Sequence, residues 1–96
     1  MEVKITRVIC DNDIVEKINR EHHVNQYEVE EVFVNQPKFR RGPKDLSHKD
    51  IRYYALGQTN SGRYLFIVFS YKGKGQAKII TAREMEAKER RLYKRK

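Results

Sequence analysis

Two arginines are the residues of this sequence best suited to chemistry on a phosphate ester. Arginine binds phosphate oxygens through two parallel N–H bonds and keeps its charge at physiological pH. Arg63 begins a long apolar run, and Arg83 follows a second apolar stretch near the C-terminus. A fixed donor aimed at developing negative charge contributes about 3–4 kcal/mol in other enzymes. We therefore predict that Arg63 and Arg83 bind and polarise a phosphate group.

Proton transfer at such a phosphate needs a group that exchanges protons near neutral pH. Histidine does so without perturbation, whereas a carboxylate or a phenol needs a shifted pKa. The candidate side chains are His22, His48, Glu84, Glu89 and Tyr93. Glu89 and Tyr93 are four residues apart, so they share one face if this segment is helical. The residues alone leave the choice among these five open.

The charge balance indicates an anionic partner. The chain has 96 residues, with 21 lysines and arginines, 13 aspartates and glutamates, and a formal net charge of +8. Residues 83–96 hold seven basic and three acidic groups, a net +4 and so half of this excess. Nucleic acid, an acidic protein and anionic lipid all match this sign. Taken one by one, such charges more often form a solvated helix face.

Several classes of protein do not fit the composition. The single Cys10 rules out an internal disulfide framework. The histidines and Cys10 show no paired ligand spacing, so no metal is expected. No apolar run approaches the ~20 residues of a membrane span, and the last helix has few large apolar residues on one face. The N-terminus lacks the pattern of a secretory signal, which favours the cytoplasm.

The N-terminal half predicts one strand followed by two helices. Residues 1–9 alternate imperfectly and indicate a short strand. A first helix is predicted over residues 13–20, with Asp13 as its N-cap. A second helix begins at Asn25 and ends before Pro37, because the residue before a proline disfavours helical geometry. In both helices an acid three residues after the cap completes a capping box.

The C-terminal half predicts an antiparallel meander. Residues 38–44 indicate an edge strand followed by a loop, and three further strands are predicted over residues 51–57, 63–71 and 76–80. The segment 63–71 is an almost continuous apolar, β-branched and aromatic run. Such a run is expected of a central strand that is covered on both faces.

A last helix is predicted to follow the last strand directly. Thr81 is the expected N-cap and Glu84 completes the capping box, which would place Arg83 at the sheet end near Arg63. The expected architecture is therefore α+β, with two N-terminal helices packed on a mostly antiparallel sheet and a C-terminal helix. Residues 1–96 are expected to form a single domain.

Five phrases along the chain resemble one family. They lie at residues 24–33, 52–57 (R-Y-Y-A-L-G), 61–68 (S-G-R-Y-L-F-I-V), 79–83 (I-I-T-A-R) and 89–93 (E-R-R-L-Y). The order of these phrases resembles the BrnT toxins, a group of RelE-like ribonuclease toxins of type II toxin–antitoxin systems. The last two phrases together are the most specific. The chain departs from the family at Glu21-His22-His23, where Lys-His-Gly is usual, and at Glu84, where a basic residue is common.

The resemblance implies a RelE-like fold and a metal-independent endoribonuclease without a cofactor. It also implies an antitoxin partner, expected to bind DNA, with oligomers formed only through the antitoxin complex. It favours a cluster of Arg83, Glu89, Arg90 and Tyr93. The predicted catalytic residues are Arg63, Arg83, Glu89 and His22. The predicted RNA-binding residues are Arg52, Lys72, Lys74, Arg90, Arg91 and Tyr93.

A second hypothesis is a non-catalytic RNA- or DNA-binding module of the same fold. It would hold nucleic acid through phosphate contacts and through stacking on Tyr53, Tyr64 or Phe39. The two hypotheses differ in whether the chain cleaves RNA.

Overall fold

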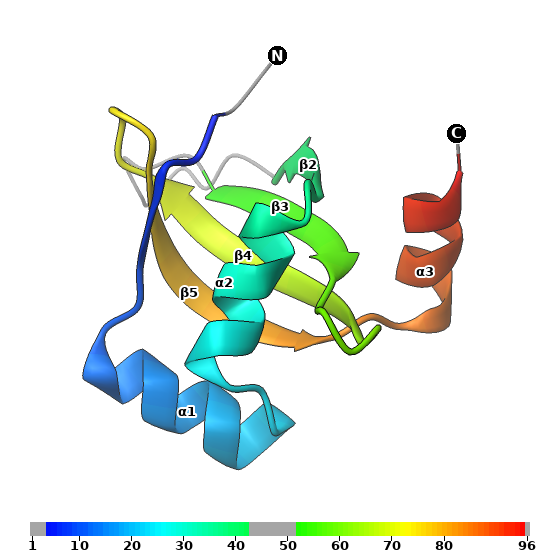
Figure 1. Cartoon of the computed structure of the whole chain (residues 1–96), viewed down its shortest axis with the longest axis horizontal. Helices are drawn as coiled ribbons and strands as arrows, with labels where there is room; N and C mark the ends of the chain where they lie inside the picture. The colour runs from blue at the N-terminus through cyan, green and yellow to red at the C-terminus, as the bar shows by residue number, and fades with distance from the viewer. Residues whose placement is uncertain (1–3, 43–51, 96) are drawn as a thin grey trace.

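The computed structural model describes residues 4–42 and 52–95, which contain a five-stranded sheet with helices on both of its faces (Figure 1). The strands are β1 (Arg7–Ile9), β2 (Lys38–Arg41), β3 (Arg52–Gln58), β4 (Tyr64–Tyr71) and β5 (Gln76–Glu84). Their order in the sheet is β1-β5-β4-β3-β2. Among the described strands, only the β1–β5 pair is parallel. The predicted α+β class and the mostly antiparallel sheet are confirmed, as is the edge strand, which spans Lys38–Arg41.

Two of the three helices begin and end close to the predicted positions. The helices are α1 (Asn12–His22), α2 (Gln26–Val34) and α3 (Ala87–Lys94). The α2 capping box is confirmed, since the Asn25 N–H donates to the Glu28 carboxylate at 3.0 Å. The Asp13 cap is wrong. Asp11 is the N-cap of α1. Its backbone is extended, and its carbonyl accepts the first hydrogen bond of the helix, from the Val15 N–H at 2.9 Å.

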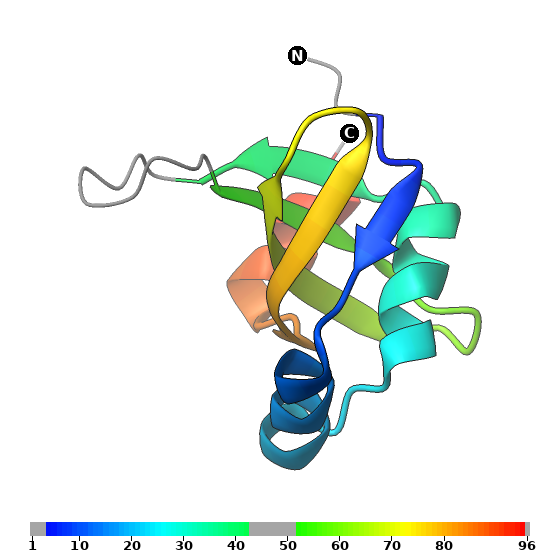
Figure 2. The same ribbon diagram turned by 90° about the vertical axis from the view of Figure 1, so that its left-hand side faces the viewer.

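The main core lies between α2 and the near face of the sheet. Leu65, Ile67 and Phe69 of β4 are fully buried on this face, and Figure 2 shows α2 lying beside the sheet there. Gly57 allows the close approach, since a Cβ at this position would lie 2.9 Å from a Val32 methyl carbon. Hydrophobic burial on this face therefore fixes which side chains of each strand point the other way.

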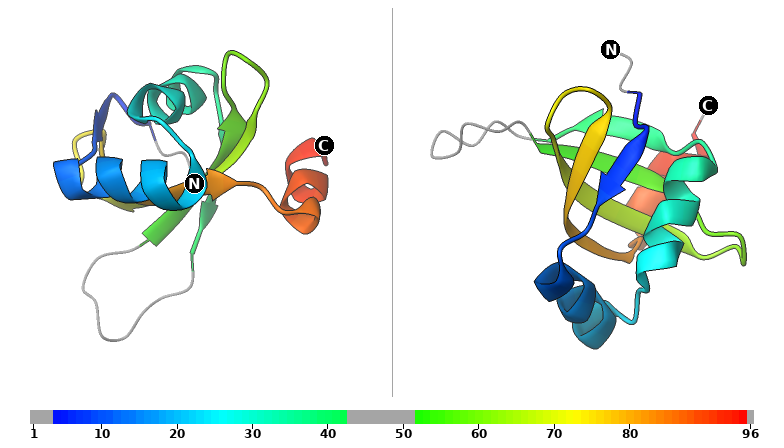
Figure 3. Two further views of the ribbon diagram at one scale, coloured as in Figure 1. Left: turned by 90° about the horizontal axis from the view of Figure 1, so that it is seen from below. Right: turned by 60° about the vertical axis from the view of Figure 1, so that its left-hand side comes forward.

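The opposite face of β4 is only partly covered, which corrects the prediction of a strand buried on both sides. Phe66 and Val68 alternate with the buried residues and remain half-exposed. Figure 3 shows α3 beside one end of the sheet, on the side opposite α2. A helix of eight residues is about 12 Å long. It therefore leaves much of this apolar face open.

The start of the last helix was predicted wrongly. Residues Thr81 to Glu84 belong to β5, where Arg83 pairs with Phe66 and Ala82 with Ile67. Ladder pairing and burial of Ala82 therefore outweigh the local capping pattern at Thr81. The helix α3 begins at Ala87, and its N-cap is Glu86, five residues after the predicted cap. This start could not be predicted from the sequence, because glutamate is not among the preferred N-cap residues.

Candidate active site

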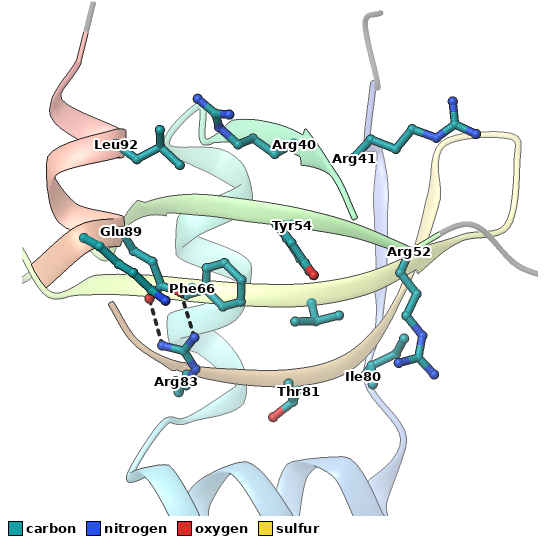
Figure 4. Close-up of a pocket in the computed structure, with 12 residues that line it drawn as sticks. Arg40, Arg41, Arg52, Tyr54, Phe66, Ile80, Thr81, Arg83, Glu89 and Leu92 are labelled. Carbon is teal, nitrogen blue, oxygen red and sulfur yellow. Dashed lines mark hydrogen bonds and ion pairs between the residues drawn. The ribbon is translucent and has the colours of Figure 1, made fainter. Parts of the chain in front are cut away.

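A hollow of about 980 Å³ lies on the open face of the sheet, beside α3 (Figure 4). Its floor is apolar and aromatic. The floor residues are Tyr54, Phe66, Val68, Ile80 and Leu92. Its rim is strongly basic, and the cationic residues are Arg40, Arg41, Arg52, Arg83 and Lys88. Glu89 is the one acid among the described lining residues. An aromatic floor with a cationic rim suits a ligand that carries both flat rings and negative charge.

Strand register explains how the floor is built. Tyr54 pairs with Val68, and Val68 pairs in turn with Thr81. Phe66 lies one row nearer to α3 and pairs with Arg83. Side chains of paired residues point to the same face of a sheet. The strands thus present one continuous surface, with Tyr54 and Phe66 in ring contact at a centroid distance of 4.8 Å.

Arg83 and Glu89 form a bidentate ion pair at the α3 end of the hollow. Arg83 Nη1 donates to Glu89 Oε1 at 2.8 Å, and Nη2 donates to Oε2 at 2.7 Å. Glu89 Oε1 also accepts from the Glu86 N–H at 2.8 Å, as part of the α3 capping box. The strand end and the helix start are therefore joined through one carboxylate.

The ion pair shifts the proton equilibria of both partners. Burial by itself would raise the pKa of the Glu89 carboxyl, but the hydrogen bonds from Arg83 and from the Glu86 N–H outweigh it and hold that pKa below its usual range. The hydrogen bond to Glu89 is the main cause that raises the pKa of Arg83. Glu89 is therefore an ionised carboxylate at neutral pH and a weak base.

Arg83 keeps unused donors in this arrangement. An arginine offers five N–H groups, and Arg83 places two on Glu89 and one on the Glu84 carbonyl at 3.0 Å. The Nε–H and the second Nη2 hydrogen have no acceptor among the described residues. The guanidinium also lies over the Phe66 ring, with Cζ 4.5 Å from the centroid. Glu89 and Phe66 thus fix the plane of a guanidinium whose remaining edge can take an anion.

Arg63 does not join Arg83, and the predicted pair of phosphate-binding arginines is not formed. Arg63 Nη1 contacts Glu28 Oε2 at 2.8 Å and donates to the His23 carbonyl at 2.9 Å. Its Nε donates to Glu84 at 3.1 Å. The reason is the alternation of side chains along a strand. Arg63 is two residues before the buried Leu65 and lies on the sheet face that carries α2, whereas Arg83 pairs with Phe66 on the opposite face. All three nitrogen atoms of Arg63 are engaged by the protein.

His22 also lies away from the hollow. It is the last residue of α1 and is half-buried. His23 follows it with φ 54°, in the left-handed region, as the C-cap of the helix. The usual family residue at this position is glycine, which takes this conformation without strain. Neither histidine is among the residues that line the hollow.

The predicted RNA-binding residues are scattered. Arg52 lines the hollow at the end far from Arg83 (Figure 4). Arg90 and Tyr93 both pack on Tyr64, with the Arg90 Cζ 4.5 Å and the Tyr93 centroid 5.9 Å from the Tyr64 ring centroid. These two residues therefore hold α3 on the sheet.

The other predicted contacts lie outside the hollow. Arg91 lines a shallow groove on α3 with Arg95. Lys72 and Lys74 lie in the turn between β4 and β5, at the end of the sheet away from α3 (Figure 1). His48 falls within residues 43–51, outside the described part of the chain.

Sequence reasoning missed most of the floor. Of the proposed stacking residues, Tyr53 is 6% exposed and Phe39 packs against Phe69 at 5.8 Å between centroids, so both belong to the core. The neighbouring Tyr54 faces the hollow instead. Alternation along the apolar run could have identified Phe66 and Val68, once one face was known to be open.

No three histidine, cysteine, aspartate or glutamate side chains converge as a metal site within residues 4–42 and 52–95. Over the same ranges, no helix is long and apolar enough to cross a membrane. Cys10 is half-buried, and desolvation together with Asp11, Glu30 and Asp13 raises the pKa of its thiol, which opposes thiolate chemistry.

The fold is that of a small α+β protein with a basic, aromatic-floored hollow on the open face of its sheet. A family model for the ribonuclease toxin BrnT of type II toxin–antitoxin systems matches residues 11–89, and the chain belongs to this family. The fold is similar to that of the ribonuclease toxin BrnT of Brucella abortus, solved at 1.1 Å, with a TM-score of 0.61 and 17% identity. The match covers 84% of this chain and 97% of that chain. No curated protein matches the sequence significantly.

Proposed function

We propose that this chain is an endoribonuclease that cleaves RNA in the hollow beside α3. The observation that carries the proposal is the fixed Arg83 guanidinium, which keeps two free N–H donors on a basic, aromatic-floored surface. Cleavage through the 2′-OH of RNA places negative charge on the phosphate oxygens in the transition state. Donors that are already oriented stabilise this charge without reorganisation.

Glu89 has two tasks in this proposal. It orients Arg83 through the paired hydrogen bonds, and it is the one carboxylate among the described lining residues that can accept the 2′-OH proton. As the 2′ oxygen bonds to phosphorus, the bond between phosphorus and the 5′ oxygen breaks, and the leaving 5′ oxygen takes a proton from water. A carboxylate with a lowered pKa is a weak base at neutral pH. We therefore assign the larger share of the rate to charge stabilisation by Arg83. Arg63 and His22 have no direct role, because neither lines the hollow.

The remaining parts of the proposal follow the family. The chain acts in the cytoplasm, adopts a RelE-like version of the fold, needs no metal or other cofactor, and is neutralised by an antitoxin that also binds DNA. The net charge of +8 suits both RNA and an acidic segment of such a partner. Co-expression of a gene adjacent to this one tests the partner: relief of growth arrest supports it, and arrest that persists with stable co-expression opposes it.

The Arg83→Gln variant tests the catalytic assignment. We expect the cleavage rate of purified protein on single-stranded RNA to fall by at least about 100-fold, since one charge-stabilising donor is lost. Arg20→Gln, at an arginine whose side chain is 71% exposed on α1, should cleave like the wild type. Cleavage should persist in a metal chelator.

Arg83→Lys separates charge from geometry, because lysine restores the charge without the planar fork. It should recover only part of the lost rate. Full activity of a folded Arg83→Gln protein would overturn the role of Arg83, and loss of wild-type cleavage in chelator would overturn the metal-free reaction.

The second candidate function is RNA binding without cleavage. It is favoured by one observation: no histidine among the described residues lines the hollow, and the pKa of its only described carboxyl is lowered. Under this alternative the wild-type protein binds single-stranded RNA but leaves it intact, and its expression does not arrest growth.

A further inference from the structure

Arg52 lines the end of the hollow that is far from Arg83 (Figure 4). It is half-buried at the start of β3, and its guanidinium has no hydrogen-bond or ion-pair partner among the described residues. The position is firmly built, since the Gly42 N–H donates to the Arg52 carbonyl at 2.8 Å. A half-buried cation without a protein acceptor is available to an external anion.

The sheet grid places Arg52 well away from Arg83. Arg52 pairs with Ser70, and Phe66, four residues earlier on β4, pairs with Arg83. Four residues of strand span about 13 Å, and the two strand spacings between β3 and β5 add about 10 Å across the sheet. The diagonal between the two backbone positions is therefore about 16 Å. In Figure 4 the two side chains lie at opposite ends of the hollow.

The surface between the two arginines is mostly apolar and aromatic, with Arg40 at its β2 edge, where it pairs with Tyr54. Tyr54, Val68 and Thr81 form the row between them. Beyond it, the row of Arg52 continues through Ser70 to Lys78. The Lys78 Nζ lies 3.6 Å from the Asp11 carboxylate, so the unpaired charge of this row is that of Arg52. Charge at both ends and an aromatic ring between them match a single strand, whose phosphates alternate with flat bases. An acidic peptide would leave the aromatic floor unused.

We propose that Arg52 forms a second phosphate-binding subsite, which holds a flanking phosphate of single-stranded RNA while the scissile phosphate lies at Arg83. This inference rests on the proposed function for the role of Arg83. A stacked strand advances about 3.4 Å per nucleotide, so a span of about 16 Å is several nucleotides long. A dinucleotide has one phosphate between its two nucleosides and reaches only one end. The substrate is therefore an RNA segment longer than two nucleotides.

Binding of non-cleavable 2′-O-methyl RNA of two and six nucleotides to purified protein tests the subsite. We expect Arg52→Gln to weaken hexamer binding about five- to tenfold at low salt and to reduce the slope of log affinity against log salt by about 0.7, the value for one phosphate contact in single strands. Dinucleotide affinity should stay within about twofold. Arg20→Gln is the matched control and should change neither affinity.

Arg52→Lys keeps the charge and should restore most of the hexamer affinity. Unchanged dinucleotide affinity in Arg52→Gln would show that its loss of hexamer affinity is not a folding defect. The proposal is overturned if Arg52→Gln weakens both lengths equally, or if it changes hexamer binding no more than the control does. The proposed catalytic role of Arg83 fails on a different result, which is RNA cleavage retained by Arg83→Gln. The binding assay uses non-cleavable RNA and therefore does not depend on cleavage.

Discussion

The two arginines predicted to bind phosphate, Arg63 and Arg83, differ in their hydrogen-bond partners. Arg63 is held by Glu28, Glu84 and the His23 carbonyl. Burial alone would lower the pKa of Arg63, but its contacts with the two carboxylates outweigh burial and raise that pKa. Arg83 is held by Glu89 and keeps two donors free in the hollow. The two side chains therefore differ in how many of their N–H donors remain available to a ligand.

The Glu89→Gln variant tests the ion pair through its pH dependence. Because the folded-state pKa of Glu89 is lowered, its ionised form stabilises the fold above the unfolded pKa of about 4.3, and this contribution is lost as pH falls through the folded-state pKa. We expect Glu89→Gln to be less stable than the wild type by about 1–3 kcal/mol at pH 7, with the difference shrinking in acid.

The measurement is the free energy of unfolding in urea between pH 3 and pH 7. Glu16→Gln, at an exposed α1 residue, is the matched control and should follow the wild type. A stability difference between Glu89→Gln and the wild type that does not change with pH would contradict the assignment.

Helix termini show where local sequence signals succeed and where they fail. The Asn25–Glu28 box of α2 is correctly predicted because cap and helix lie next to each other and need no distant partner. The box predicted at Thr81 and Glu84 has the same pattern, yet pairing with β4 draws these residues into β5. Capping patterns are reliable only where no neighbouring strand competes for the same backbone groups.

The C-terminus of α1 allows a direct test at this scale. His23 has φ 54°, and a non-glycine residue pays a steric penalty there. We expect His23→Gly to raise the free energy of unfolding by about 0.5–1 kcal/mol, after the greater entropy of glycine in the unfolded chain is subtracted.

His22→Gly is the matched control, since His22 lies in the last turn of the helix. It should lower the free energy of unfolding by about 0.5–1 kcal/mol. Thermal or urea unfolding measures both variants. Equal destabilisation by the two glycines would contradict the left-handed conformation of His23.

For the whole molecule, the sheet separates the main core from the hollow. One face carries α2, the core and the Arg63 cluster, and the other carries the hollow with its basic rim. The excess of positive charge is therefore not spread evenly. Under the proposed function, we therefore expect RNA cleavage to be more sensitive to substitutions in the hollow than to substitutions on the α2 face, with Glu89 affecting both cleavage and stability.

Arg63→Met tests this division. The variant leaves the Glu28 carboxylate, 14% exposed, without its cation, so we expect a loss of about 2–3 kcal/mol in the free energy of unfolding. The cleavage rate per folded molecule should change less than about threefold, because no group in the hollow is removed. The cleavage rate of Arg83→Gln, also expressed per folded molecule, should fall by at least about 100-fold. The double variant Glu28→Gln/Arg63→Met should regain part of the stability, and a large loss of rate without a loss of stability would restore Arg63 to the catalytic site.

The sequence by itself determined the α+β class, the strand meander, the α2 cap and the basic character of the chain. These depend on local periodicity, on turn residues such as Gly62 at φ 95°, and on composition. The family resemblance also came from contiguous phrases, and the family match supports it. That the chain forms a single domain stays a prediction.

Only the tertiary structure decided the site. Which face of β4 is left open depends on where α2 and α3 pack, and that choice separates Arg63 from Arg83 although both lie at sheet ends. Tyr54 and Tyr53 are adjacent and chemically identical, yet one lines the hollow and the other is buried. The physical reason is that side chains alternate between the two faces of a strand, so a site on one face is set by long-range packing that no local pattern records.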